Sequence, residues 1–209
     1  MLKFTMPDAG LHNKMAAASP QDGAIVTALG RRSVVLVGMM GAGKSSVGRK
    51  LGGRLGLPFI DADTKIEEAA GMSIPDIFET RGEAEFRAGE ARVIARLLDG
   101  GPQVLATGGG AYMNPETRAL IRDKGVSVWL KADFDVLMKR IKRRTDRPML
   151  KTADPAATLK HLMEVRYPVY AEADVTVESR EVMHEVIVEE ILERLRDVMK
   201  TGAGLEKTQ

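Results

Sequence analysis

The sequence predicts an α/β protein with a parallel β-sheet, and three observations support this class. A β-branched, aliphatic run at residues 33–37 reads as a buried strand and leads into the phosphate-loop pattern G-x-x-x-x-G-K-S at Gly38–Ser45. Helical periodicity begins directly after it, with Val47, Leu51 and Leu55 on one face. Further along, short apolar runs alternate with helical patterns. This alternation specifies right-handed βαβ units and a sheet of five strands covered by helices on both faces.

The same patterns give the elements in chain order. Besides the first strand, strands are expected at 57–61, 104–107, 127–130 and 175–177. Helices are expected from residue 46 and at 64–70, 73–80, 82–98, 115–124, 133–143, 156–171 and 181–199. Thr64 and Glu67 form a capping-box pattern, and Asn114-Pro115 is typical of a helix start. Pro168 predicts a kink or an early end of its helix.

One folded domain is expected over residues 31–200. Residues 1–30 alternate polar and small side chains and lack the features of signal or transit peptides, so we expect a mostly disordered extension. Residues 201–209 are expected to be a flexible tail. The polar, basic, proline-broken segment at about 144–156 is expected to be a loop, and its Arg147 is placed to close over a nucleotide like a lid.

Composition excludes several functional classes. Hydrophobic residues make up 44% and charged residues 29% of the 209, which is typical of a soluble globular protein. The net charge of +2 and one dense basic cluster at 139–147 do not predict a nucleic-acid platform. No apolar run approaches the ~18 residues of a membrane span. The absence of cysteine excludes disulfides, thiol catalysis and cysteine-ligated zinc, and it suits a cytoplasmic protein.

The phosphate loop predicts a nucleotide site. Its glycines allow a tight turn with backbone N–H groups pointing inward, and the helix that follows directs its positive end at the same point. We expect ATP to be bound by Gly41, Ala42, Gly43, Lys44, Ser45 and Ser46. Lys44 would contact the β- and γ-phosphates, and the Ser45 hydroxyl would bind Mg²⁺. The strand and helix on either side favour this interpretation over an ordinary glycine-rich turn.

Two carboxylates end the second strand. Asp61 and Asp63 are two apart in what we expect to be extended backbone, so both side chains would point toward the phosphate loop. One would hold Mg²⁺ through its water and the other would accept a proton from a substrate hydroxyl. The alternative is that Asp63 only caps the next helix, but Thr64 is already a suitable cap.

The third strand ends in Thr107 followed by Gly108, Gly109 and Gly110, where bare backbone invites a small polar ligand. A tight turn is the alternative. Arg87 and Arg166 interrupt otherwise apolar patterns, and guanidinium groups bind carboxylates well. Without further observations, the interpretation that they belong to solvated helix faces is favoured. Glu90, one turn after Arg87, is placed to orient it.

Six motifs, in this order and spacing, resemble the shikimate kinase family: GMMGAGKSS, FIDAD, GEAEFRAGE, LATGGG, RTDRPML and EVRYPVY. The resemblance covers residues 33–199. It implies a three-layer P-loop fold like that of nucleoside-monophosphate kinases, with sheet order 2-3-1-4-5 and a lid. It also implies transfer of the γ-phosphate of ATP to the 3-hydroxyl of shikimate, with Mg²⁺, by a monomer that supplies aromatic amino-acid biosynthesis.

The resemblance also assigns roles. Lys44, Asp63 and Arg147 are implied as catalytic, Ser45 and Asp61 as metal-binding, and Arg140 and Arg147 as further ATP contacts. The substrate is implied to contact Asp63, Arg87, Gly108, Gly109, Gly110 and Arg166. Residues 178–181 lack a proline common in the family's adenine loop, and the N-terminal extension lies outside the family pattern. The three histidines, His12, His161 and His184, show no ligand spacing and receive no role.

Two other functions remain as alternatives. A kinase for another polyol acid, such as gluconate, shares the loop and the expected fold, although the paired arginines and the triple glycine argue against it. A regulatory module that uses ATP as a switch would bind the nucleotide without acceptor-dependent turnover.

Overall fold

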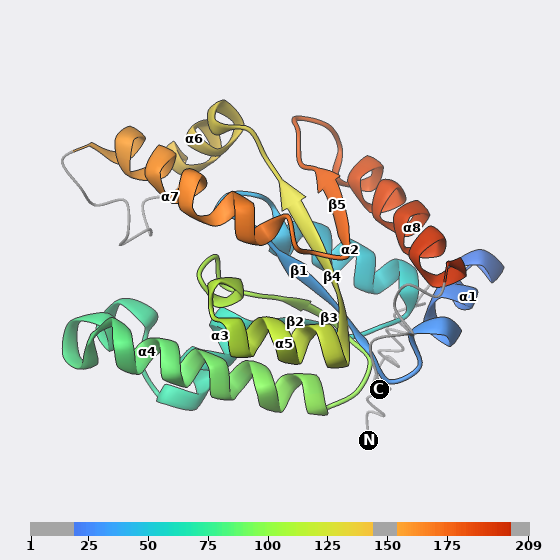
Figure 1. The fold of residues 1–209 in the computed structure, drawn as a ribbon, viewed down its shortest axis with the longest axis horizontal. Helices are drawn as coiled ribbons and strands as arrows, with labels where there is room; N and C mark the ends of the chain where they lie inside the picture. The colour runs from blue at the N-terminus through green and yellow to red at the C-terminus, as the bar shows by residue number, and fades with distance from the viewer. Residues whose placement is uncertain (1–18, 144–153, 202–209) are drawn as a thin grey trace, which may run out of the picture.

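A computed structural model describes residues 19–143 and 154–201, and the expected sheet forms (Figure 1). Five parallel strands lie in the order β2-β3-β1-β4-β5, which confirms the order 2-3-1-4-5. The strands are β1 (Ser33–Val37), β2 (Phe59–Asp61), β3 (Val104–Ala106), β4 (Gly125–Lys131) and β5 (Val175–Glu178). In the centre, β1 pairs with both β3 and β4, so its carboxyl end lies between those of its neighbours.

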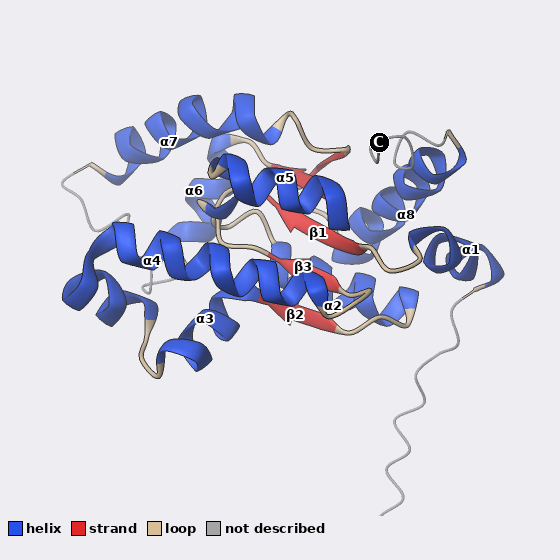
Figure 2. Cartoon of the chain, turned by 60° about the horizontal axis from the view of Figure 1, so that its bottom comes forward, coloured by secondary structure: helices blue, strands red, loops and turns tan. Residues whose placement is uncertain are grey.

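Helices cover both faces of the sheet, giving three layers (Figure 2). The helices are α1 (Pro20–Leu29), α2 (Lys44–Leu55), α3 (Ala62–Ala70), α4 (Ile74–Asp99), α5 (Pro115–Lys124), α6 (Phe134–Lys142), α7 (Pro155–Tyr170) and α8 (His184–Lys200), with a short 3₁₀ turn η1 (Ala111–Met113). On one face α2 and α8 pack together, and α5 and α4 pack on the other. The pair α3–α4 stands beside the β2 edge.

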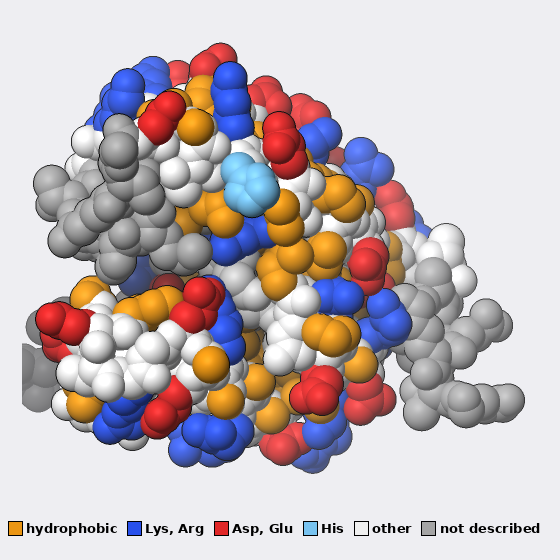
Figure 3. Space-filling view, turned by 60° about the vertical axis from the view of Figure 1, so that its left-hand side comes forward, with side chains coloured by type: hydrophobic (Ala, Val, Ile, Leu, Met, Phe, Trp, Pro, Cys, Tyr) orange, Lys and Arg blue, Asp and Glu red, His pale blue; other side chains and the backbone are white. Residues whose placement is uncertain are grey.

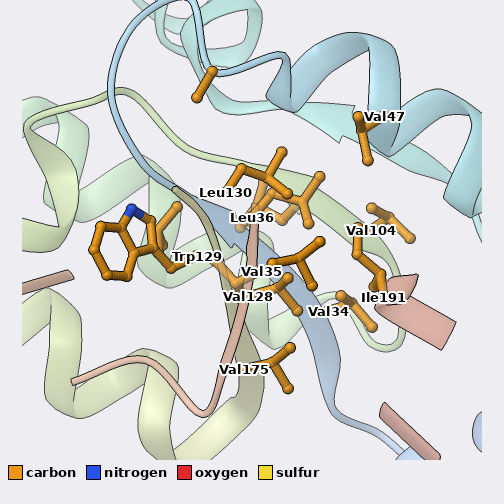
Figure 4. Packing of buried hydrophobic residues seen from close by; sticks show 14 of the residues in the cluster. Val34, Val35, Leu36, Val47, Val104, Val128, Trp129, Leu130, Val175 and Ile191 are labelled. Atoms are coloured by element: carbon orange, nitrogen blue, oxygen red, sulfur yellow. The ribbon is translucent and has the colours of Figure 1, made fainter. Parts of the chain in front are cut away.

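The core consists mainly of aliphatic side chains from the sheet and its flanking helices, together with Trp129 of β4 (Figure 4). Every residue of β1 is buried, as are Val128 and Leu130 of β4, because both faces of a central parallel strand are covered. Val47 of α2 and Ile191 of α8 close one face. This packing fixes the strand ends that carry the phosphate loop.

The prediction that residues 1–30 are mostly disordered is wrong for residues 20–29. The structure places Pro20–Leu29 in α1, whereas we expected disorder through residue 30. Ser19 caps the helix through the Asp22 N–H, and Ile25 and Leu29 are buried against α2 and α8. A helix this short is stabilised mainly by such tertiary packing, which a local pattern does not reveal. Residues 1–18 and 202–209 lie outside the described residues.

Several element ends also differ from expectation. The third helix starts at Ala62 and is capped by Asp61, not by Thr64, so Asp63 lies in its first turn and the expected extended backbone is wrong. The two helices predicted around residue 81 are one α4, broken at Gly82 (φ 80°, ψ 170°). Helix α7 continues past Pro168 to Tyr170. The last helix begins at His184 rather than at 181.

The distribution of charged side chains on the surface is consistent with the small net charge of +2. On the face seen in Figure 3, acidic and basic side chains are interspersed, and neither sign dominates. None of the helices described has both the length and the apolar character needed to cross a bilayer. Residues 144–153, which include Arg147 and most of the expected lid, lie outside the described residues.

Candidate active site

The phosphate loop joins β1 to α2 at the centre of the sheet's carboxyl edge. Its glycines Gly38, Gly41 and Gly43 have φ values of 136°, 82° and 94°, which other residues rarely adopt. Gly38 is also constrained by space, because a Cβ there would lie 2.7 Å from the Leu130 carbonyl oxygen. The loop's curvature therefore depends on the glycines that define the motif.

Lys44 and Ser45 lie at the start of α2. Lys44 Nζ donates hydrogen bonds to the carbonyl oxygens of Gly38 (2.8 Å) and Met39 (2.9 Å), so the ammonium group lies over the loop. Ser45 Oγ lies 2.7 Å from Asp61 Oδ2. The two predicted metal-binding residues are thus in contact, although they are 16 positions apart.

Asp61 has a second role that the sequence did not indicate. Its Oδ1 accepts a hydrogen bond from the Asp63 N–H (3.2 Å), so Asp61 is the N-cap of α3. Asp61, and not Asp63, therefore caps this helix. The Asp63 side chain lines two adjoining cavities.

The first cavity, of about 370 Å³, is the donor cavity. It includes Lys44 and Ser45 among its walls, with Gly41, Gly43, Ser46 and Arg140. The second, of about 330 Å³, is the acceptor cavity, and it includes Arg87, Glu90, Gly110 and Arg166. Both are lined by Met40, Ser45, Asp61, Asp63, Gly108 and Gly109. A group in one cavity is therefore adjacent to a group in the other, with Asp63 at the border.

The three glycines after β3 matter because of the space they leave. A Cβ on Gly108 would lie 2.7 Å from Glu90 Oε1, and one on Gly110 would lie 2.5 Å from Arg87 Nη1. A Cβ on Gly109 would lie 3.4 Å from Arg166 Nη1. None of the three has a positive φ, so a turn requirement does not explain them. Each glycine lets a charged side chain approach the backbone.

Glu90 and the two arginines form a buried group of charges in the acceptor cavity. Arg87 Nη1 donates to Glu90 Oε2 at 2.7 Å, and Glu90 is only 2% exposed. Burial raises the pKa of Glu90, since it outweighs the opposing charge of Arg87. Among the described residues, Glu90 Oε1 and Arg166 Nη1 have no hydrogen-bond partner although both are buried. Such groups are costly unless a ligand satisfies them.

Tyr170 forms a hydrogen bond to the backbone of the segment Gly108–Gly110. Its hydroxyl donates to the Gly109 carbonyl oxygen, and its ring packs against Trp129 with 5.9 Å between centroids. Burial raises the pKa of Tyr170 to about 12, so the hydroxyl stays protonated and remains a donor. No local pattern indicates this role, because the contact joins residues 61 positions apart.

The outer wall of the donor cavity comes from α6 and from the segment that follows β5. Arg140 donates to the carbonyl oxygens of Gly41 (3.2 Å) and Arg180 (2.8 Å) and to Ser179 Oγ (2.8 Å). It therefore ties the phosphate loop to that segment. Arg143 and His184 also line the cavity. No local pattern predicts either contact: Arg143 directly follows α6, and only the fold brings His184, at the start of α8, to this edge.

Most of the predicted site residues come together here. Ala42 is an exception: its side chain is buried away from both cavities, and its carbonyl accepts from Ser179 Oγ at 2.7 Å. Any contact it makes with a nucleotide would be through its backbone. Arg147 lies outside the described residues, so its role stays a prediction.

Comparison with known proteins identifies the family of the chain. The family model described as shikimate kinase matches residues 40–196. The shikimate kinase of Rhodopseudomonas palustris is 63% identical over 184 residues, covering 88% of this chain and 91% of that protein. That of Bradyrhizobium diazoefficiens is 64% identical, covering 86% of each. A shikimate kinase from Acinetobacter baumannii, solved in complex with shikimate, has a TM-score of 0.78 and 34% identity, covering 88% of this chain and 99% of that one. The chain belongs to the shikimate kinase family.

Proposed function

We propose that the protein transfers the γ-phosphate of ATP to the 3-hydroxyl of shikimate, giving shikimate 3-phosphate for aromatic amino-acid biosynthesis. The observation that carries this proposal is the pair of adjoining cavities. One is walled by the phosphate loop, the other by two arginines, and Asp63 lines both. A donor phosphate and an acceptor hydroxyl bound in them would meet at that aspartate.

The acceptor cavity suits a small polyhydroxy acid. Arg87 and Arg166 supply cationic donors for a carboxylate, and Arg166 Nη1 has no hydrogen-bond partner among the described residues. Asp63 accepts hydrogen bonds from ring hydroxyls, and it takes the proton of the attacking hydroxyl as the new P–O bond forms. Gly108, Gly109 and Gly110 let the ligand and the charged side chains approach closely.

The donor cavity suits ATP with Mg²⁺. The neighbouring oxygens of Ser45 and Asp61 are the hard ligands that Mg²⁺ prefers, and this ion usually takes one or two protein ligands together with phosphate oxygens and waters. When bound, it would neutralise charge on the phosphate oxygens. We assign the phosphates to the backbone of Gly41–Ser46 and to Lys44, and the base to the neighbourhood of Arg140.

Positioning and charge neutralisation carry the reaction in this proposal. Phosphoryl transfer passes through a loose transition state, so alignment of donor and acceptor contributes more than the strength of the base. Lys44 neutralises the charge that develops on the transferred group. Arg147 would add a second positive charge from the lid. We further propose that the protein acts as a cytoplasmic monomer.

An acceptor-dependent assay tests the proposal. ADP release is measured with ATP and Mg²⁺ alone, then with shikimate, and then with gluconate at the same concentration. We expect rapid release only with shikimate. Faster turnover with gluconate would identify the protein as a kinase of another polyol acid. ATP binding with no acceptor-dependent release would instead support a regulatory module.

A further inference from the structure

A third cavity lies between α3 and α4. It has a volume of about 420 Å³, and residues of both helices line it. Its floor consists of the apolar side chains of Ile66, Ile77, Phe86 and Val93, which form a small core separate from the main one. This helix pair stands beside the β2 edge of the sheet (Figure 2).

The rim of this cavity is positively charged. Arg81, Arg92 and Arg96 line it together with a single acidic residue, Glu85. Glu85 already pairs with Arg81 at 3.6 Å. Across residues 19–143 and 154–201, no carboxylate lies within 4.0 Å of the guanidinium groups of Arg92 or Arg96. Two cations therefore line one apolar hollow, and neither forms an ion pair with a described residue.

The middle of the rim is open because it carries a glycine. Gly89 lies between the turns that hold Glu85 and Arg92, and a Cβ there would meet only Arg92 Nη2, at 3.9 Å. Small-molecule sites typically combine an apolar lining with a few polar groups that fix orientation. Guanidinium groups bind carboxylates through paired hydrogen bonds.

We propose that this cavity is a second small-molecule site, for a carboxylate with a flat apolar body. The apolar part would lie on Phe86 and its neighbours, and the carboxylate would bind Arg92 and Arg96. The inference goes beyond the proposed function, because nothing in the transfer reaction uses these residues.

The site is coupled to the acceptor cavity through Phe86. Among the described residues, Phe86 is the one that lines both cavities, and its ring lies 5.0 Å from the Arg87 guanidinium carbon. A ligand beneath that ring favours the α3–α4 arrangement that places Arg87 and Asp63 around the acceptor. By linkage, it lowers the KM for the acceptor and leaves the KM for ATP unchanged. This coupling rests on the proposed function, whereas the binding site does not.

The binding test uses 2-naphthoate as the probe and its uncharged analogue 2-naphthamide as the control, with isothermal titration of the full chain. We expect the amide to bind at least about ten-fold more weakly, as for the loss of a charge-assisted hydrogen bond. The double variant Arg92→Gln/Arg96→Gln should lose affinity to the same extent. Arg31→Gln, an exposed arginine far from the cavity in sequence, should not.

A competition experiment separates this site from the acceptor cavity, which also holds arginines. Saturating shikimate should leave naphthoate binding in place. Displacement of the probe by shikimate, or wild-type affinity in the double variant, would overturn the proposed site. For the coupling, saturating naphthoate should lower the KM for shikimate by about two-fold or more, and an unchanged or raised KM would overturn it. Titration gives the binding result even if shikimate proves not to be the acceptor.

Discussion

Two buried carboxylates each face two arginines in this protein, and the two groups differ in completeness. In the first, the Asp22 cluster, Oδ2 of Asp22 lies 3.1 Å from Arg54 Nη2 and Oδ1 lies 3.0 Å from Arg196 Nη2. In the second, the Glu90 cluster of Glu90, Arg87 and Arg166, one glutamate oxygen is bonded to Arg87 and the other has no partner among the described residues.

The pKa values of the two carboxylates shift in opposite directions. Burial alone would raise the pKa of Asp22, but hydrogen bonds from Ser19, Arg54 and Arg196 outweigh it and lower that pKa below its ordinary value. Burial prevails at Glu90 and raises its pKa. Among the described residues Arg196 Nε has no hydrogen-bond partner, but both carboxylate oxygens of Asp22 accept hydrogen bonds from arginines.

The difference shows how similar residue types serve structure in one place and function in another. The Asp22 cluster joins α1, α2 and α8, and its two arginines are balanced by Asp22 and by Glu189, which lies 2.9 Å from Arg54 and 3.9 Å from Arg196. The Glu90 cluster borders a cavity, and among the described residues Glu90 Oε1 and Arg166 Nη1 are unsatisfied. A bound carboxylate would accept from Arg166 Nη1, whereas Glu90 Oε1 needs a donor such as a ligand hydroxyl. Substitutions in the first should affect stability, and substitutions in the second should affect substrate use.

The largest effect on activity is expected at Lys44, outside both clusters. Lys44→Ala should lower kcat about 10³-fold, because it removes a positive charge aimed at the transferred phosphate. Asp63→Asn should cost less, about 10²-fold, because the loose transition state depends little on the base. Steady-state ADP release measures both, and Lys65→Ala, an exposed lysine paired with Glu68, is the control. A larger loss for Asp63→Asn would assign the main role to proton transfer.

The largest effect on stability is expected at Asp22. Asp22→Asn should lower the free energy of unfolding by about 3 kcal/mol, because it removes the buried partner of Arg54 and Arg196 and leaves only the half-exposed Glu189 to pair with them. Both KM values should stay unchanged. Urea unfolding followed by circular dichroism measures the loss. Asp99→Asn, which breaks an exposed pair with Lys124, should cost less than about 1 kcal/mol. Equal losses in the two variants would contradict the role of the Asp22 cluster.

Arg166→Gln should change substrate binding and not stability, the reverse of Asp22→Asn. We expect the KM for shikimate to rise about 30-fold, because a charge-assisted contact to the carboxylate is lost. The free energy of unfolding should not fall, since the variant removes a buried charge with an unsatisfied nitrogen. Arg122→Gln, a half-exposed arginine, serves as the control. A destabilised variant with an unchanged KM would make the two clusters alike and remove the contrast between them.

Gly110→Ala tests the space that the Glu90 cluster requires. The new methyl group would lie 2.5 Å from Arg87 Nη1, so the guanidinium must move. We expect the KM for shikimate to rise about ten-fold, with the KM for ATP unchanged. Gly53→Ala, where a Cβ meets nothing within 4 Å, is the matched control. An unaltered KM in Gly110→Ala would show that Arg87 adapts without cost.

The smallest effect is a difference in pH dependence. Because the pKa of Asp22 is lower in the folded chain than its ordinary 3.8, its stabilisation is complete well above that pH. It is lost as the pH falls through the lowered value. The stability difference between wild type and Asp22→Asn should therefore shrink between pH 6 and about pH 3. Urea midpoints across this range measure it, and a constant difference would indicate that the charge of Asp22 is unimportant.

The sequence alone determined the sheet, and its order through the family resemblance, and it predicted most of the residues that line the two cavities. Strands were recognisable because a buried parallel strand is a short apolar run, and the phosphate loop because its glycines meet local backbone requirements. Ser45 with Asp61, and Arg87 with Glu90, were paired correctly. Both pairs follow from where a strand ends or from the period of a helix.

Only the tertiary structure decided what each of these residues contacts. Helix α1 escaped prediction because its stability comes from Asp22, Ile25 and Leu29 meeting residues far along the chain. The triple glycine suggested exposed amides or a turn, but its reason is the close approach of Glu90, Arg166 and Arg87. The cap of α3, the role of Tyr170 and the cavity beneath Phe86 are likewise long-range effects. Local patterns encode the backbone of each element, whereas these features depend on distances between elements that only folding sets.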